Sequence, residues 1–246
     1  MLTSVLEGGV GVGPYPELVG KRILITGLDL CAGVDVARAF AEQGCRIVLH
    51  TTAHGSEADA VLEMLAQTAS ELQVYSEPLM ERDATVRFAQ TAAKTFNGLD
   101  AVINLVPFDA DAIDFDDVEE AISRQFEKTT LLTRIAANRM RLTWTEGLIL
   151  NIMTCSAPRS DAELMLLSIA RAMLATMTRA EAGEWAGEAI RINAIAPSLD
   201  QIDASPRLET EPDIAALAMF LASPRGRHLS GLVFDTVLAG CVAEAI

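Results

Sequence analysis

A turn with two glycines, Gly27 and Gly33, follows the first apolar run of the chain and precedes a stretch with helical spacing. Backbone amides at such a turn can bind a phosphate, because glycine lets the backbone approach the ligand and the helix dipole favours negative charge. Cys31, however, adds bulk where a phosphate would lie. Asp29 adds a charge that repels a like charge about 4 Å away by about 4 kcal/mol at an effective dielectric constant of about 20. The glycines therefore indicate either a retained dinucleotide site or only a tight turn.

Apolar runs alternate with helical patterns along the chain. Strands are predicted at 22–26, 46–50, 72–75, 101–104, 147–154, 190–197 and 232–234, and helices at 34–43, 56–70, 83–96, 117–140, 162–182 and 211–222. Ser56 and Asp83 are the predicted N-caps of their helices. Parallel neighbours need crossover helices, so this alternation predicts a parallel sheet covered on both faces. We predict an α/β fold, a doubly wound parallel sheet of the Rossmann type in a three-layer sandwich.

The chain has a length that suits one such domain, since its 246 residues fall near the usual upper size of a single core. Residues 1–16 begin with a Gly-rich, weakly patterned stretch and are predicted to be a flexible leader, which leaves 17–246 for the domain. Hydrophobic residues make up 50% of the chain but aromatic residues only 5%, so the core must be built mostly from aliphatic side chains.

The net charge of −15 and the pI of about 4.5 disfavour two classes of partner, nucleic acid and anionic membrane, because an acidic surface repels phosphate. No apolar run approaches the ~20 residues that span a bilayer. The four cysteines never form a C-x-x-C pair, which argues against a zinc site or a disulfide framework. We therefore expect a protein of the reducing cytoplasm.

Two other groups of residues were weighed as metal ligands. His50 and His54 are four residues apart but have no third ligand nearby in the sequence. The acidic run at 109–120 lacks the glycine and the ligand spacing of a calcium loop, and acids are favourable at the start of a helix. We expect no metal site.

Six residues in the second half of the chain carry a family resemblance: Asn151, Ser168, Arg191, Asn193, Ala194 and Pro197. With the strand, helix and strand around them, they resemble the short-chain dehydrogenase/reductase family. The resemblance implies a Rossmann domain, an NAD or NADP cofactor and oxidoreductase chemistry. Members carry a Ser after the first of these strands and Tyr-x-x-x-Lys on the helix. The Tyr gives a proton, the Lys lowers the pKa of that Tyr, and the Ser polarises a carbonyl.

In the register set by the resemblance, other residues hold these chemical positions. The Tyr falls on Met165, the Lys on Ile169, the Ser on Thr154 or Met153, and a supporting Asn on Gln125. Met and Ile can transfer no proton, whereas Thr154 can still donate a hydrogen bond. Met165 and Ile169 share a helix face at i and i+4. They therefore either fill the site by apolar packing or line an apolar ligand pocket.

The resemblance also assigns the residues around a cofactor: Gly27, Gly33, Thr51, Asn104 and Pro197. Thr51 stands where an acid would bind a ribose or an Arg a 2′-phosphate, so nothing selects between NAD and NADP. Pro107 stands where the family has a glycine and lacks an amide donor. We expect weak or absent cofactor binding.

These replacements favour a non-catalytic or regulatory member of the family. The alternative is an NAD(P)-dependent oxidoreductase with an atypical active site. Family members pack their long helices across a two-fold axis, so we expect a homodimer or homotetramer, or assembly with an active paralogue. The helix at 162–182 has more apolar residues than one buried stripe requires, among them Leu164, Leu167, Ala170, Leu174 and Met177.

Overall fold

The structure is a computed structural model that describes residues 14–110, 113, 118–198, 208 and 210–237. Seven strands in these residues form one sheet in the order β3-β2-β1-β4-β5-β6-β7. Every neighbouring pair is parallel. The strands are β1 (Arg22–Leu28), β2 (Arg46–Thr51), β3 (Glu71–Tyr75), β4 (Ala101–Pro107), β5 (Leu148–Thr154), β6 (Arg191–Pro197) and β7 (Val233–Thr236). The predicted doubly wound parallel sheet is confirmed.

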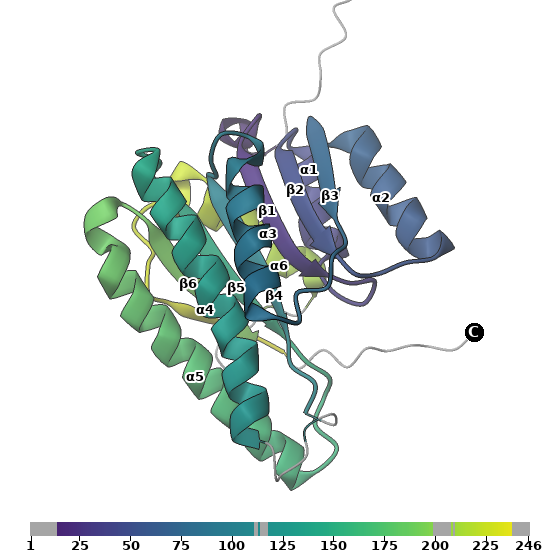
Figure 1. Ribbon diagram of the computed structural model, residues 1–246, viewed down its shortest axis with the longest axis vertical. Helices are drawn as coiled ribbons and strands as arrows, with labels where there is room; N and C mark the ends of the chain where they lie inside the picture. The colour runs from purple at the N-terminus through teal and green to yellow at the C-terminus, as the bar shows by residue number, and fades with distance from the viewer. Residues whose placement is uncertain (1–13, 111–112, 114–117, 199–207, 209, 238–246) are drawn as a thin grey trace, which may run out of the picture.

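Helices cover both faces of the sheet and complete the predicted three-layer sandwich. They are α1 (Val34–Glu42), α2 (Ser56–Thr68), α3 (Arg82–Thr95), α4 (Val118–Leu142), α5 (Asp161–Trp185) and α6 (Glu211–Ala222). In Figure 1, α3, α4 and α5 lie in front of the sheet, and α1 and α6 lie behind it. On that far side, α1 packs against both α2 and α6.

The core is divided between the two faces of the sheet by the alternation of side chains along each strand. In β1, Ile23 and Ile25 join the cluster under α1 and α6, whereas Leu24 joins the cluster under α3 and α4. All three side chains are at most 1% exposed. Burial of an aliphatic side chain stabilises a fold by about 1.5–3 kcal/mol, so the apolar strands supply much of the driving force.

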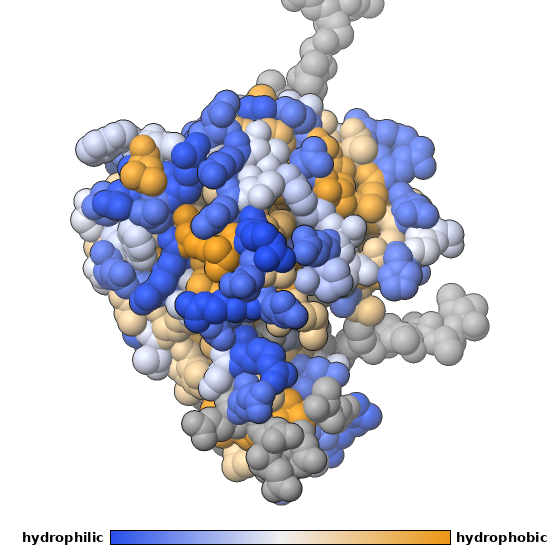
Figure 2. Space-filling view, viewed as in Figure 1, coloured by the Kyte–Doolittle hydropathy of each residue, from blue (hydrophilic) through white to orange (hydrophobic). Residues whose placement is uncertain are grey.

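The outer surface is mostly hydrophilic on the side covered by α3, α4 and α5, with separate apolar patches (Figure 2). No described helix is long and apolar enough to cross a membrane.

Two predicted helix caps are wrong. The N-cap of α2 is Gly55 rather than Ser56, and the N-cap of α3 is Glu81 rather than Asp83. Neither helix has a side-chain cap hydrogen bond at these positions. The predicted caps lie within the first turn instead, where polar side chains are also favourable, so composition alone did not identify the cap residue.

The chain ends fall largely outside the described residues. Residues 1–13 of the predicted leader and residues 238–246 are not among them, nor is part of the acidic run at 109–120. The described residues before 17 already contact the domain: the Tyr15 amide donates to Gln43 Oε1 at 3.1 Å. The Arg225 guanidinium lies 4.8 Å from the Tyr15 ring centre.

A carboxylate, Glu181 of α5, lies buried where α5 packs against α4. Its side chain is only 5% exposed, and its nearest cation is Arg134 of α4, with Nε 3.8 Å from the carboxylate. Neither carboxylate oxygen has a hydrogen-bond partner among the described residues. Burial raises the pKa of Glu181 to about 7; Arg134 opposes the shift and the neighbouring Glu184 adds to it. The protonated form is therefore favoured in the folded state.

We expect this group to make stability fall as pH rises. A raised folded-state pKa contributes stability that is present below the unfolded-state pKa and is lost as pH rises through the folded value of about 7. One pKa unit corresponds to about 1.4 kcal/mol, so the loss approaches about 3 kcal/mol. Urea unfolding at pH 5 and pH 8 measures it. Glu181→Gln should remove the pH dependence and the more exposed Glu184→Gln should keep it; equal pH profiles for wild type and Glu181→Gln would contradict the assignment.

Candidate functional site

Gly27 and Gly33 lie at the carboxyl end of β1, with φ angles of 75° and 95°. A Cβ on Gly27 would lie 2.6 Å from the backbone oxygen of Leu105, and a Cβ on Gly33 would overlap the Leu105 side chain. Leu105 belongs to β4, and β1 and β4 are the neighbours at which the strand order changes direction. Ligands of open α/β sheets bind at this point. Close packing against Leu105 thus requires both glycines, whatever ligand the crevice holds.

The turn between the two glycines is closed by its own hydrogen bonds. The Asp29 amide donates to the Ala32 carbonyl at 3.1 Å, and the Ala32 amide donates to the Asp29 carbonyl at 3.3 Å. The Cys31 amide donates to the Asp29 carboxylate at 2.5 Å. Three amides that could hold a phosphate are therefore already satisfied within the turn.

The N-terminus of α1 is capped by a distant carboxylate. Its N-cap, Gly33, has no side chain to accept a hydrogen bond. Glu211, the first residue of α6, accepts from the Asp35 amide at 2.8 Å, and the Gly33 and Val36 amides lie close to the same carboxylate. Burial raises the pKa of Glu211, and the charge of Asp35 adds to the rise, although the hydrogen bonds oppose it. An anion supplied by the chain itself thus occupies this helix terminus.

Two residues predicted to bind a cofactor are engaged inside the protein. Asn104 is 1% exposed; it accepts from Thr26 Oγ1 at 3.0 Å and donates to Asn151 Oδ1 at 2.8 Å, which links β1, β4 and β5. Thr51 is 2% exposed and donates to the Leu28 carbonyl at 2.7 Å, joining the ends of β2 and β1. The sequence placed both residues at the correct edge of the sheet but did not reveal these bonds.

The other predicted positions are partly described. Pro197 ends β6, opposite Thr236 of β7. Thr154 ends β5, opposite Pro107, and is half-buried. Gln125 belongs to α4, but its side chain lies outside the part of the molecule that the structure describes.

On α5, Met165 and Ile169 are 49% and 39% exposed. The expectation that they fill the site by apolar packing is therefore wrong. Leu167, by contrast, is 1% exposed and belongs to the core cluster that includes Met153 of β5. One turn further on, Arg171 forms an ion pair with Asp235 of β7 at 2.6 Å. Its second terminal nitrogen, Nη1, is buried and has no hydrogen-bond partner among the described residues.

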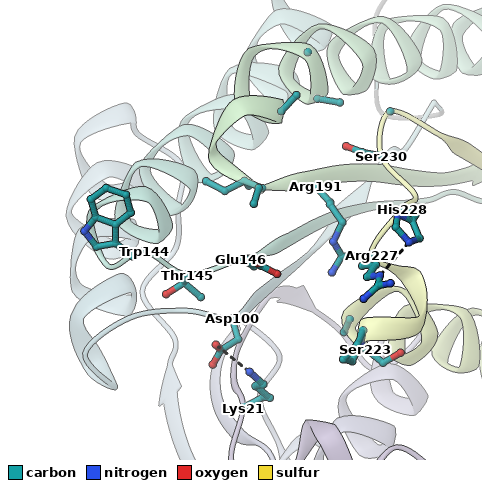
Figure 3. Close-up of a pocket in the computed structure, with 18 of the residues that line it drawn as sticks. Lys21, Asp100, Trp144, Thr145, Glu146, Arg191, Ser223, Arg227, His228 and Ser230 are labelled. Atoms are coloured by element: carbon teal, nitrogen blue, oxygen red, sulfur yellow. Dashed lines mark hydrogen bonds and ion pairs between the residues drawn. The ribbon is translucent and has the colours of Figure 1, made fainter.

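A hollow of about 1070 Å³ opens at the opposite, amino end of the sheet (Figure 3). Several cations line it, but two of them hold the fold together. Arg22 pairs with Asp100 at 2.7 Å, and Arg191 donates to the carbonyls of Leu221 and Gly226 at 2.6 and 3.0 Å. The hollow is therefore separate from the crevice at the carboxyl ends of the strands.

The described residues offer no metal centre, and Cys155 is not a reactive thiol. No group of three or more His, Cys, Asp and Glu side chains among them could hold a metal ion. Burial raises the pKa of Cys155 to about 11, so this thiol stays protonated at neutral pH and is a poor nucleophile.

Comparisons with known proteins identify the family. A family model described as enoyl-(acyl carrier protein) reductase matches residues 32–210. The chain belongs to the short-chain dehydrogenase/reductase family. Rat peroxisomal 2,4-dienoyl-CoA reductase is 26% identical over 89% of this chain and 83% of its own length. An uncharacterised oxidoreductase of Mycobacterium tuberculosis is 27% identical over 89% of this chain and 91% of its own length.

Solved structures of the short-chain dehydrogenase/reductase family share the fold. A NADH-dependent reductase complexed with NAD superposes with a TM-score of 0.74 at 20% identity, covering 91% of this chain and 97% of that one. Hydroxysteroid dehydrogenase from Escherichia coli superposes with a TM-score of 0.73 at 22% identity, covering 93% of this chain and 99% of that one.

The family's Tyr-x-x-x-Lys pair has to face the carboxyl end of the sheet, where a ligand binds in an α/β fold. Met165 and Ile169 face away from the core, whereas Leu167 and Arg171 have the same spacing and face it. A shift of two residues rotates a helix position by about 200°. The sequence register therefore placed the pair on the opposite side of α5. The buried stripe of Leu167, Ala170 and Leu174 was the signal that could have corrected it.

We expect stability measurements to separate the two faces of α5. Leu167→Ala should lower the free energy of unfolding by about 2–5 kcal/mol, because it leaves a cavity in the core. Ser168→Ala, the control at the next residue, where the side chain is exposed, should change it by less than about 1 kcal/mol. Urea unfolding measures both values. A loss for Ser168→Ala equal to that for Leu167→Ala would show that the helix is rotated relative to this description.

Proposed function

We propose that this chain is an NAD(P)-dependent oxidoreductase with an atypical active site. The observation that carries the proposal is Arg171, a cation one turn after Leu167 on the core-facing side of α5, whose buried Nη1 has no hydrogen-bond partner among the described residues. Arg171 takes the position that the family gives to its Lys. With Met165 and Ile169 in the family's Tyr and Lys positions, the site would lack both the acid and its cationic neighbour; with Leu167 and Arg171 there, it keeps the cation.

The chemistry proposed for this site is stabilisation of an oxyanion. Hydride transfer to a carbonyl, or to an alkene conjugated with one, leaves negative charge on oxygen. A preorganised donor such as Arg171 stabilises that charge, and Thr154 at the end of β5 supplies a hydroxyl. Leu167 cannot give a proton, so water or the substrate has to provide it. The absence of a protein acid lowers the rate by about 10²–10⁴-fold relative to a Tyr-containing relative.

The substrate class proposed is an acyl thioester. The matched family is described as an enoyl-(acyl carrier protein) reductase, and the rat relative is a 2,4-dienoyl-CoA reductase. Either NAD or NADP is the proposed cofactor. Its binding is expected to be weak, because Asp29 and Glu211 already occupy the amides of the crevice. The free thiols of Cys45 and Cys155 favour a reducing compartment such as the cytoplasm.

A second candidate is a non-catalytic member that acts through binding or assembly. The specific observation that favours it is the same closed crevice, together with the replacement of the acid by Leu167. Cofactor affinity separates the two candidates, since the non-catalytic one needs no nicotinamide.

We expect turnover to depend on the charge of Arg171. With NADH or NADPH and an enoyl or 3-oxoacyl thioester, Arg171→Met should lower kcat by about 10²-fold, the usual effect of removing one oxyanion donor. Arg171→Lys should keep most of the activity. Arg179→Met, which removes an exposed cation from the same helix, is the control. No nicotinamide oxidation by the wild type with either thioester would overturn the oxidoreductase proposal and leave the second candidate.

The exposed apolar stripe of α5 is our proposed contact for a homodimer. Leu167, Ala170 and Leu174, which the sequence suggested as surplus, are in fact buried within the protomer. The exposed apolar residues of this helix are instead Leu164, Met165, Ile169 and Met173, between 38% and 49% exposed. An apolar stripe of this kind on a long helix favours association.

Light scattering should give a mass near twice the 26.3 kDa of one chain. Met165→Glu combined with Ile169→Glu should yield the single-chain mass, because charges on the stripe would be buried without partners. Trp144→Glu, at a residue 90% exposed beyond the end of α4, is the control and should leave the mass unchanged. A wild-type mass near 26.3 kDa would refute the dimer.

A further inference from the structure

We infer that Glu211 is an internal competitor of the cofactor diphosphate, whose carboxylate must leave the N-terminus of α1 before NAD or NADP can bind there. This inference rests on the proposed oxidoreductase function, because it presumes that the crevice between β1 and β4 is a dinucleotide site. It assigns to Glu211 the control of cofactor affinity.

The carboxylate of Glu211 makes the contacts that a phosphate oxygen would make. It accepts from the Asp35 amide at 2.8 Å and lies close to the amides of Gly33 and Val36 at the first turn of α1. In dinucleotide-binding sheets of this type the pyrophosphate sits at the N-terminus of this helix, held by amides and by the dipole. Two anions cannot share these donors, so binding of one excludes the other.

A second carboxylate satisfies one further amide of the turn, and backbone carbonyls satisfy two more. Asp29 accepts from the Cys31 amide at 2.5 Å, and the Asp29 and Ala32 amides are bonded across the turn. Asp29 and Glu211 come from distant parts of the chain, yet both satisfy amides of the same strand-to-helix turn. Their combined effect is a turn that is stable without a ligand.

The helix that carries Glu211 is firmly held, so the side chain and not the helix is the moving part. Thr210 caps α6, with its hydroxyl accepting from the Asp213 amide and the Asp213 carboxylate accepting from the Thr210 amide. Helix α6 also packs along α1 through buried residues such as Ala215 and Ala218. A change of rotamer at Glu211 frees the amides without disturbing this packing.

The charges around Glu211 make the competition sensitive to pH. Asp35 lies next to it and pairs with Arg38 at 2.5 Å, and Asp29 lies in the preceding turn. The pKa of Glu211 is raised, chiefly by burial, so its carboxylate takes up a proton at a higher pH than an ordinary glutamate does, and protonation weakens its hold on the amides. Cofactor affinity should therefore rise as pH falls.

Calorimetric titration of the full-length protein with NADH and with NADPH tests the inference. Glu211→Gln keeps an oxygen that can accept from the Asp35 amide but removes the charge, so it should tighten the Kd at least tenfold. Glu211→Ala should tighten it further while lowering the Tm, because α1 loses its cap. The control is Glu42→Gln, which makes the same charge change at the far end of α1, where the side chain is 59% exposed; its Kd should match the wild type.

The outcomes separate this inference from the proposed function. Tighter binding by both Glu211 variants, and a wild-type affinity that increases as pH falls but stays flat in Glu211→Gln, support it. Equal binding by the wild type and Glu211→Gln overturns the inference and leaves the function standing. If neither the wild type nor Glu211→Gln binds NADH or NADPH, although circular dichroism shows that all variants are folded, both the inference and the proposed oxidoreductase function are overturned.

Discussion

Backbone amides at a helix N-terminus need acceptors, and in this chain the acceptor at α1 is the carboxylate of Glu211. Other amides of the crevice are satisfied inside the protein as well. Asp29 and Ala32 close the glycine turn through their own backbone hydrogen bonds, and Leu105 of β4 packs against the glycines. The point at which a Rossmann sheet normally receives its ligand is thus filled by the protein's own groups.

The same edge of the sheet carries two side chains that can donate hydrogen bonds to a substrate. Arg171 extends from α5 to Asp235 of β7, and a buried nitrogen of its guanidinium has no acceptor among the described residues. Thr154 ends the neighbouring β5. A cation and a hydroxyl there suit a reaction that develops negative charge on oxygen. The closed crevice and this cation are the basis of the proposed oxidoreductase function, in which a cofactor would have to displace an internal anion.

The fold was predictable from the sequence, because strands buried on both faces are continuously apolar and their alternation with helices leaves few topologies. The orientation of α5 was not. Met165, Ile169 and Leu167 are all apolar, and only contact with the sheet decides which of them is buried. A family register that depended on one stretch of helix therefore came out two residues away from the residues that face the core.

The hydrogen bonds of the site lay beyond sequence reasoning for a different reason. Gly27, Gly33, Thr51 and Asn104 were assigned to the correct edge, because strand ends mark that edge. Glu211 is 176 residues from its partner Asp35, and no local pattern connects them. Only the packing of α6 against α1 brings the carboxylate to the helix terminus.

The most direct test of this account is a set of ¹H–¹⁵N correlation spectra of the protein, recorded during titration with NADH. If the dinucleotide displaces Glu211, the amide signals of Gly33, Asp35 and Val36 should shift together and saturate at one Kd. That Kd should tighten in Glu211→Gln. Saturable shifts in the signals of other residues, with the signals of these three amides unchanged, would contradict the account. The cofactor would then bind without using the crevice between β1 and β4.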